Sequence, residues 1–137
     1  MYDGYCSDMT RTVALGKVTE EMREVYNTVL KAQKACLEKI KAGVTGFEID
    51  KIARDIIYKN YEGCFGHGLG HSVGLEIHEM PAFNTVYKGK IEEGTIMTVE
   101  PGIYIENKFG VRIEDMVYIT KEGCINLTSS PKDLIIL

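Results

Sequence analysis

Apolar residues recur three or four positions apart after Thr19, a spacing that is typical of one face of a helix. Thr19 is a suitable N-cap, and Glu20 and Glu21 would favour the positive end of the helix dipole. Gly43 is expected to end the helix. The apolar positions that define its buried face are Met22, Val25, Val29, Leu30, Leu37 and Ile40.

A second helix is predicted directly afterwards, because Thr45 and Glu48 have the spacing of a capping box. Its buried side comprises Phe47, Ile49, Ile52, Ala53, Ile56 and Ile57. Both helices are amphipathic and are expected to cover a sheet. The charged residues of this region are interpreted as a solvent-facing surface, namely Glu24, Lys31, Lys34, Glu38, Lys39, Lys41, Lys51, Arg54 and Asp55.

Segments rich in β-branched residues flank the two helices. Residues 1–15 are interpreted as two short strands, and residues 96–105 and 111–120 as further strands, with a hairpin turn at residues 121–123. The order of strands, two helices and strands predicts the α+β class. In this arrangement the two helices pack on one face of a largely antiparallel sheet.

Composition narrows the class of protein. The chain has 137 residues, of which 45% are hydrophobic and 26% charged, as in a single globular domain. A net charge of −4 argues against a nucleic-acid partner, and no apolar run reaches the roughly 20 residues of a membrane helix. Without a signal peptide or a C-x-x-C pair, reduced cysteines and a cytoplasmic location are expected for Cys6, Cys36, Cys64 and Cys124.

All three histidines of the chain, His67, His71 and His78, lie in or just after a glycine-rich stretch over residues 63–74. Glycines allow backbone and side chains to crowd a common point. A helical H-x-x-x-H would suggest a zinc-binding pair, but this density of glycine disfavours a helix. The segment is therefore interpreted as a loop that brings histidines to a site.

Three carboxylates complete a candidate cluster. Glu100 and Glu114 lie in apolar, strand-like surroundings, and Asp8 lies at the head of a predicted strand. Burying a carboxylate costs several kcal/mol unless a positive group compensates it. An arginine such as Arg11 or Arg112 would explain one such residue. A divalent cation explains the whole cluster better, because oxygen ligands with one imidazole suit Mn²⁺, Fe²⁺, Co²⁺ or Zn²⁺.

Four ordered sequence blocks resemble one known family. Residues 67–79 follow the pattern H-G-L-G-H-x-V-G-L-x-I-H-E, and residues 4–11 follow G-Y-x-S-D-x-T-R. Residues 98–104 and 111–115 match two further ligand blocks. Over its whole length the chain resembles the creatinase-fold, or pita-bread, metallopeptidases, in particular the Xaa-Pro aminopeptidase and prolidase branch. The resemblance implies the C-terminal part of a pita-bread fold with a curved sheet.

The resemblance also implies roles for individual residues. The implied metal ligands of a two-cation site, with Mn²⁺ as the expected metal, are Asp8, His71, Glu100 and Glu114. The residues implied to line the substrate site or to act in catalysis are His67, His78, Glu100 and Arg112. The implied reaction is hydrolysis of peptides with proline in the second position by a water that the cations activate.

The family also has an upstream half and a further metal-binding aspartate before the position that Asp8 matches. Residues 1–137 are therefore expected to be a single truncated domain that lacks the N-terminal half. Such a domain would bind one cation well and a second one weakly or not at all. Its uncovered apolar surface would favour a homo-oligomer.

Three alternatives stay open. Methionine aminopeptidases share the fold and ligands, but their histidine block lacks the H-G-L-G-H form. A non-catalytic module that binds peptides or proteins would usually lack the ligands. A creatinase-like hydrolase of small guanidino compounds would use no metal. Neither of the last two would need the four retained ligands.

Overall fold

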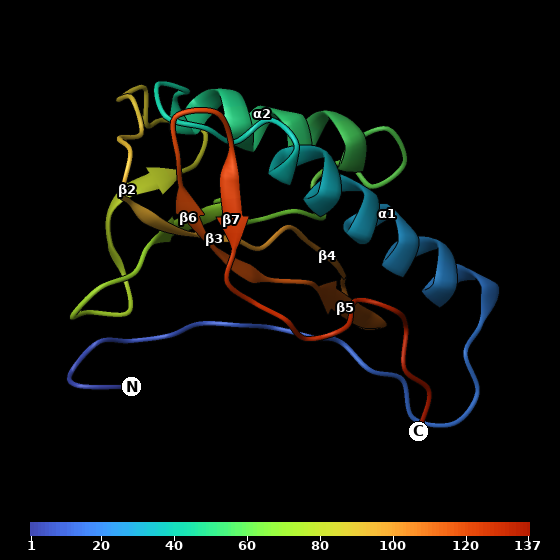
Figure 1. Cartoon of the computed structure of the whole chain (residues 1–137). Helices are drawn as coiled ribbons and strands as arrows, with labels where there is room; N and C mark the ends of the chain where they lie inside the picture. The colour runs from blue at the N-terminus through green and yellow to red at the C-terminus, as the bar shows by residue number, and fades with distance from the viewer.

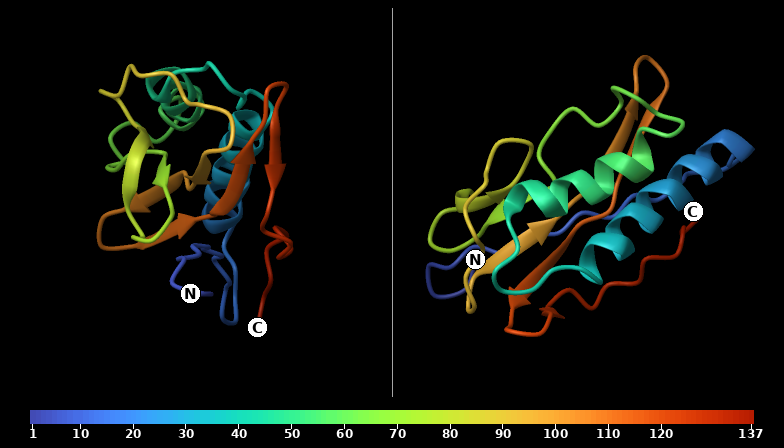
Figure 2. Two further views of the ribbon diagram at one scale, coloured as in Figure 1. Left: turned by 60° about the vertical axis from the view of Figure 1, so that its left-hand side comes forward. Right: turned by 90° about the horizontal axis from the view of Figure 1, so that it is seen from above.

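Two helices lie on one face of an antiparallel sheet in the computed structural model, which describes all residues from 1 to 137. Figures 1 and 2 show both helices on the same side of the strands, while the first residues of the chain run along the opposite side. The predicted α+β class is confirmed. The elements are α1 (Glu20–Leu37), α2 (Gly46–Ile57), β1 (Gly70–Ser72), β2 (Glu79–Phe83), β3 (Ile96–Val99), β4 (Gly102–Ile105), β5 (Phe109–Arg112), β6 (Asp115–Ile119) and β7 (Cys124–Asn126).

Helix α1 begins where the sequence predicts but ends earlier. The Thr19 hydroxyl accepts a hydrogen bond from the Met22 amide, so the N-cap forms as expected. The helix stops at Leu37, not at Gly43. The Ala42 amide donates to the Thr120 carbonyl and the Gly43 amide to the Ile91 carbonyl, so tertiary contacts replace helical hydrogen bonds there.

The main sheet has the strand order β2-β1-β3-β6-β7, and β4 and β5 form a separate hairpin. The predicted strands 96–105 and 111–120 are each interrupted, contrary to expectation. At the first break the Glu100 amide donates to the Leu69 carbonyl, and at the second the Glu114 amide donates to the Thr10 carbonyl. Both glutamates therefore lie between strands. The turn at residues 121–123 joins β6 to β7 as predicted.

The segment 1–15 does not form the two strands that were predicted. It is extended and makes only isolated bridges, such as Thr10 with Glu114 and Ala14 with Ile136. It runs past the break between β5 and β6, where the Thr12 hydroxyl hydrogen-bonds to the backbone of Arg112, and this break leaves no continuous ladder for it to join. The segment nevertheless runs along the side of the sheet away from the helices (Figure 1). There the Asp8 amide lies 2.9 Å from the sulfur of Met116 on β6.

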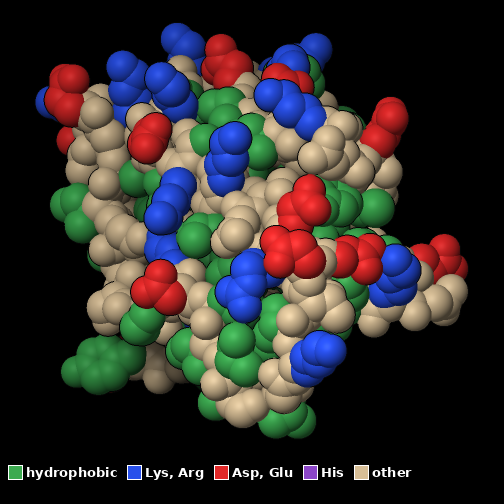
Figure 3. Space-filling view, turned by 90° about the vertical axis from the view of Figure 1, so that its right-hand side faces the viewer, with side chains coloured by type: hydrophobic (Ala, Val, Ile, Leu, Met, Phe, Trp, Pro, Cys, Tyr) green, Lys and Arg blue, Asp and Glu red, His purple; other side chains and the backbone are tan.

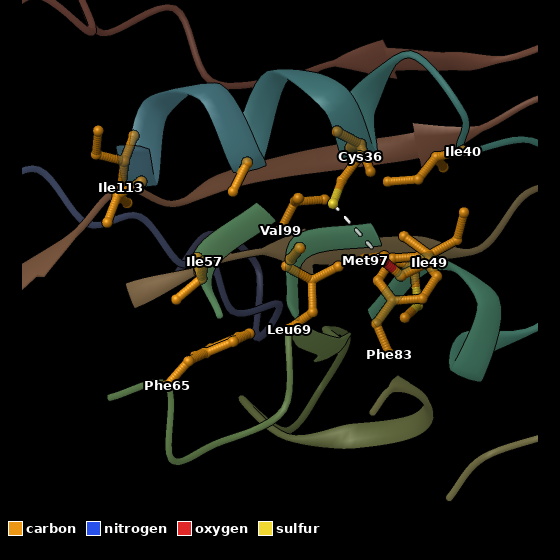
Figure 4. Close-up of a cluster of buried hydrophobic side chains, with 14 of the residues drawn as sticks. Cys36, Ile40, Ile49, Ile57, Phe65, Leu69, Phe83, Met97, Val99 and Ile113 are labelled. Carbon is orange, nitrogen blue, oxygen red and sulfur yellow. Dashed lines mark hydrogen bonds between the residues drawn. The ribbon is translucent and has the colours of Figure 1, made fainter. Parts of the chain in front are cut away.

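The core lies between the helices and the sheet, where twenty buried apolar side chains form one cluster. Figure 4 shows Cys36 of α1 facing Ile49 of α2 in this cluster; its thiol donates to the Ile49 carbonyl at 3.7 Å. Burial raises the pKa of Cys36 to about 12. The residue therefore stays a neutral thiol and behaves as a small core side chain.

A buried ion-pair network attaches both chain ends to this core. Asp115 is fully buried and contacts Arg11 at 2.7 Å, Lys132 and, at 2.6 Å, the Asn126 amide. Burial opposes ionisation of Asp115, but the hydrogen bonds from these three partners outweigh it and lower the pKa of this carboxyl. Arg11 thus compensates Asp115 and does not pair with Asp8 or Glu114.

One residue assigned to the solvent-facing surface is not solvated. Arg54 is shielded from solvent and pairs with the buried Asp50 one helical turn earlier, at 2.6 Å. The other charged residues assigned to that surface are exposed. The spacing of charged residues along the helix did not predict that Arg54 is shielded. Its partner Asp50 is a charged residue that faces inward.

The outer surface is mixed in charge. Basic and acidic side chains are interspersed over the face that Figure 3 shows. The structure contains no helix with the length and apolar character needed to span a bilayer.

We expect Gly70→Ala to lower the free energy of unfolding by about 3 kcal/mol, because an added methyl group would overpack the β1–β3 interface. A Cβ at Gly70 would lie 2.0 Å from the backbone carbonyl oxygen of Thr98. Gly66→Ala is the matched control, since a Cβ there meets nothing within 4 Å. Urea unfolding of both variants provides the measurement. Equal stabilities would show that the strands can separate without cost.

Candidate metal centre

Three potential metal ligands converge from distant parts of the sequence. Asp8 comes from the extended N-terminal segment, His71 from β1, and Glu114 from the break between β5 and β6. One ligand atom from each lies within 4.8 Å of the others. The His71 Nε2 atom lies 3.8 Å from an Asp8 carboxylate oxygen. The structure describes no other group of this kind.

Glu114 is the most buried of the three, with 2% of its surface exposed. Its Oε2 atom accepts a hydrogen bond from the Thr10 hydroxyl at 2.5 Å, whereas its buried Oε1 atom has no partner. Burial is the main cause that raises the pKa of Glu114 to about 7, and the nearby negative charges of Glu100 and Asp8 act in the same direction. The Thr10 hydrogen bond and the positive charge of Arg112 oppose this shift but do not cancel it.

Glu100 lies beside this group but is not one of its three members. Its Oε1 atom is 3.2 Å from His71 Nε2, and Arg112 approaches the other oxygen at 3.9 Å. Burial alone would lower the pKa of His71, but the hydrogen bonds with Glu100 and the Ser72 carbonyl outweigh it and raise that pKa. The structure thus places Glu100 against the imidazole and not against Asp8 and Glu114.

A single hydroxyl orients two of these residues. The buried Thr98 on β3 accepts a hydrogen bond from the His71 amide at 2.9 Å and donates to Glu100 Oε1 at 3.1 Å. The His71 Nδ1 atom lies 3.1 Å from the Ser72 carbonyl oxygen, which leaves Nε2 free to face the carboxylates. Partners of this kind fix the ring orientation of metal-binding histidines.

The donor set fits a divalent cation. Two carboxylates and one imidazole lie within 4.8 Å of one another. One of the carboxylate oxygens is buried without a hydrogen-bond partner. A cation would neutralise the negative charge that is left there. Oxygen-rich sites with an imidazole suit first-row divalent metals. This fit is judged from Asp8, His71 and Glu114 of this chain alone.

A cleft of about 340 Å³ adjoins the centre. His78 lies beside His71, with 4.2 Å between the ring centroids, and is exposed. Only one residue of the lining is hydrophobic, so the cleft suits a polar ligand. The lining consists of His67, Gly68, Gly70, His71, His78, Ala82, Asn84, Glu100 and Arg112. All four residues predicted for the substrate site therefore lie along it.

Tyr104 on β4 also belongs to this region, and sequence reasoning missed it. Its hydroxyl accepts a hydrogen bond from Arg112 at 3.1 Å and lies 2.8 Å from His67 Nε2. It thus connects two residues that come from different elements. The only sequence signal was its place in the same block as Glu100, which says nothing about where its hydroxyl points.

The loop that carries His78 is held by Glu79. The Glu79 carboxylate accepts a hydrogen bond from the Glu76 amide at 2.9 Å. It also occupies the space beside Gly74, where any Cβ would lie 2.6 Å from a carboxylate oxygen. The glycine and the carboxylate together set the path of the chain between β1 and His78.

Comparison with known proteins identifies the family of the chain. Residues 1–121 match the model of metallopeptidase family M24, and the chain belongs to this family. It is 48% identical over 137 residues to an uncharacterized peptidase, YqhT, of Bacillus subtilis (strain 168), covering 99% of this chain and 39% of that protein. It is 47% identical over 136 residues to an Xaa-Pro dipeptidase of Pyrococcus furiosus, covering 98% and 39%.

Solved structures give the same result. An Xaa-Pro dipeptidase from Bacillus anthracis superposes with a TM-score of 0.97 at 51% identity, and an X-Pro aminopeptidase from Thermotoga maritima with 0.96 at 45%. In both, the alignment covers 99% of this chain and 39% of the solved chain. The chain thus spans about 39% of the length of the curated relatives quoted above. These structures share its fold, as the predicted pita-bread class requires.

Proposed function

We propose that this chain forms the metal-binding part of a peptide hydrolase that cleaves before a proline in the second position. The observation that carries the proposal is the convergence of Asp8, His71 and Glu114 beside a polar cleft. The names of the relatives, an Xaa-Pro dipeptidase and an X-Pro aminopeptidase, support the substrate class. Because the relatives are longer, residues 1–137 would act as one part of a larger catalytic domain.

We propose Asp8, His71, Glu100 and Glu114 as the metal-binding residues, with Mn²⁺ as the metal and Co²⁺, Zn²⁺ or Fe²⁺ as possible substitutes. Glu100 would join the other three as a ligand because its Oε1 atom lies 3.2 Å from His71 Nε2, beside the group. When bound, such a cation lowers the pKa of water and polarises the peptide carbonyl, which supplies the chemistry of hydrolysis.

The remaining residues of the cleft would bind the peptide and move protons. His78 is exposed at the cleft and close to His71, so it would donate a hydrogen bond to the oxygen of the scissile carbonyl. Glu100, with one oxygen facing His71, would carry a proton at its carboxylate towards the leaving nitrogen. His67 and Arg112, joined through Tyr104, would position the substrate.

The assay is release of a free amino acid from an Xaa-Pro dipeptide by the protein that contains this chain. We expect release with Mn²⁺, loss of release in EDTA, and far slower cleavage of the matched Xaa-Ala dipeptide. Metal-independent cleavage, or equal rates on the two dipeptides, would contradict the proposal. Faster release of N-terminal methionine would instead favour a methionine aminopeptidase.

We also propose that the protein resides in the cytoplasm, where its four free cysteines would remain reduced.

We further propose that the isolated chain self-associates. Its accessible surface is 7877 Å². A compact monomer of this mass would expose about 7200 Å². Large apolar side chains are exposed near both ends of the chain, namely Tyr2, Tyr5, Leu15, Ile125, Leu127, Ile136 and Leu137. Sedimentation of a monodisperse monomer at tens of micromolar would contradict self-association.

A further inference from the structure

The loop that carries His67 is anchored from helix α2, outside the metal centre. Asp50 and Arg54 lie one helical turn apart and pair at 2.6 Å, with 1% and 17% of their side chains exposed. Elsewhere on the same helix, Lys51 and Asp55 pair with identical spacing but are 57% and 61% exposed. Helix stability alone would not require the first pair to be buried.

Both members of the buried pair reach the backbone of residues 65–69. The Arg54 guanidinium donates to the Phe65 carbonyl at 2.8 Å and to the His67 carbonyl at 2.5 Å. It also lies over the Phe65 ring, 4.5 Å from the centroid. Asp50 accepts a hydrogen bond from the Leu69 amide at 3.0 Å. Three backbone groups of the loop are therefore satisfied by one ion pair.

The opposite side of this loop is closely packed. A Cβ at Gly68 would lie 2.9 Å from the Phe83 carbonyl oxygen, so the backbone runs directly against the end of β2. The loop is thus confined between α2 and β2. The Phe65 and His67 rings also pack nearly perpendicular to each other, with 5.0 Å between centroids, so Phe65 contacts the imidazole directly.

We propose that Asp50 and Arg54 are positioning residues that hold His67 in register with Tyr104 at the cleft. The inference rests on the proposed function only for the role of His67 towards a peptide. The His67 Nε2 atom lies 2.8 Å from the Tyr104 hydroxyl, and this geometry requires the loop backbone to keep its place. The planar fork of arginine spans two carbonyls at once, which the single ammonium of lysine cannot do.

The test compares three variants of the metal-free chain by NMR. Arg54→Lys keeps the charge but removes the fork. The pair Asp50→Asn with Arg54→Met removes both charges together, so no unpaired buried charge is left. The pair Lys51→Met with Asp55→Asn is the control on the exposed face. Hydrogen exchange at the Leu69 amide and the imidazole ¹⁵N shifts of the three histidines are measured in each.

We expect exchange at Leu69 to become at least about tenfold faster in the first two variants, since the loop then opens without unfolding the core. The His67 shifts should change while those of His71 and His78 stay, and the control should match the parent. Unchanged Leu69 exchange and His67 shifts would overturn the inference. Equal changes in the imidazole ¹⁵N shifts of all three histidines would also overturn the inference, because such changes would indicate a general loss of structure.

A Mn²⁺ titration of the same variants separates this inference from the proposed function. The Mn²⁺ affinity should stay within about twofold of the parent, because the substitutions leave Asp8, His71 and Glu114 unchanged. Metal affinity is usually lost when the substituted residue contacts a metal ligand. A parent chain that binds no Mn²⁺ would contradict the metal-dependent function and not the anchoring of His67. A parallel loss of Mn²⁺ affinity in both anchoring variants would show that the pair acts on the metal centre and would contradict the assignment to His67.

Discussion

Replacing His71 by alanine is expected to weaken Mn²⁺ binding by at least about a hundredfold, since loss of a ligand's hydrogen-bond partner alone costs about 10–100-fold. His71 supplies the only nitrogen in the group with Asp8 and Glu114. Its Nε2 atom also lies 3.2 Å from Glu100, so its removal takes away the hydrogen-bond partner of that carboxylate as well. Calorimetric titration of the metal-free chain measures the effect.

The other two histidines provide matched controls. His67→Ala and His78→Ala remove imidazoles that line the cleft but lie outside the metal-ligand group, so both variants should bind Mn²⁺ nearly as well as the parent. The parent should bind one equivalent tightly, because the structure contains one group of this kind. Similar losses in all three variants, or two tight equivalents in the parent, would contradict the assignment.

The metal-free chain should become less stable as the pH rises from about 5 to about 8. Burial raises the pKa of Glu114 to about 7 from its ordinary 4.5, so the folded chain holds this proton more tightly than the unfolded one. The stabilisation is complete below about pH 4.5 and is lost as the pH rises through 7. At 1.36 kcal/mol per pKa unit, the loss is about 3 kcal/mol.

Other titrating groups do not reverse this sign. The pKa of His71 is also raised, through its hydrogen bonds with Glu100 and the Ser72 carbonyl against the opposing effect of burial. Its contribution is likewise lost as the pH rises. The lowered pKa of Asp115 acts in the opposite direction but only in acid, below its ordinary value of 3.8. Urea unfolding in EDTA at pH 5 and pH 8 therefore isolates the site.

Glu114→Gln provides the control for this pH dependence. A neutral amide cannot ionise, so the variant should be more stable than the parent at pH 8 without metal and should lose most of the dependence on pH. The same change should abolish tight Mn²⁺ binding, because it removes the most buried carboxylate of the group. If parent and variant follow parallel stability curves, Glu114 does not titrate as inferred.

The sequence predicted the helices better than the strands. Thr19 and Thr45 cap helices as expected, because capping is a local interaction within four residues. The strand breaks at Glu100 and Glu114 depend on backbone partners at Leu69 and Thr10, which are far away in the sequence. No local pattern predicts such partners, and the same is true of the isolated bridges that replace strands in segment 1–15.

The candidate site shows the same division. Glu100 and Glu114 could be singled out because carboxylates in apolar surroundings need compensation. The three histidines could be singled out as a cluster in a glycine-rich stretch, and only the family resemblance distinguished His71 from the other two. Tyr104 could not, because a tyrosine in a strand is ordinary and only its two hydrogen-bond partners make it part of the cleft. Arg54 was assigned to solvent for a similar reason: besides Asp50, its partners include the Phe65 and His67 backbone carbonyls, which leave no trace in the order of side chains.

The extended N-terminal segment has a consequence for how the chain would respond to chelation. It brings Asp8 to the metal group, yet few backbone hydrogen bonds hold it to the sheet near that residue, such as those of Cys6 with Gly74 and of Glu114 with Thr10. A cation bound there would therefore hold the N-terminal segment against the sheet. The free energy of cation binding would stabilise this attachment. Stripping the metal would release the residues before Arg11 first, because Arg11 stays paired with the buried Asp115. A protease would then cut there while the helices and the core remained intact.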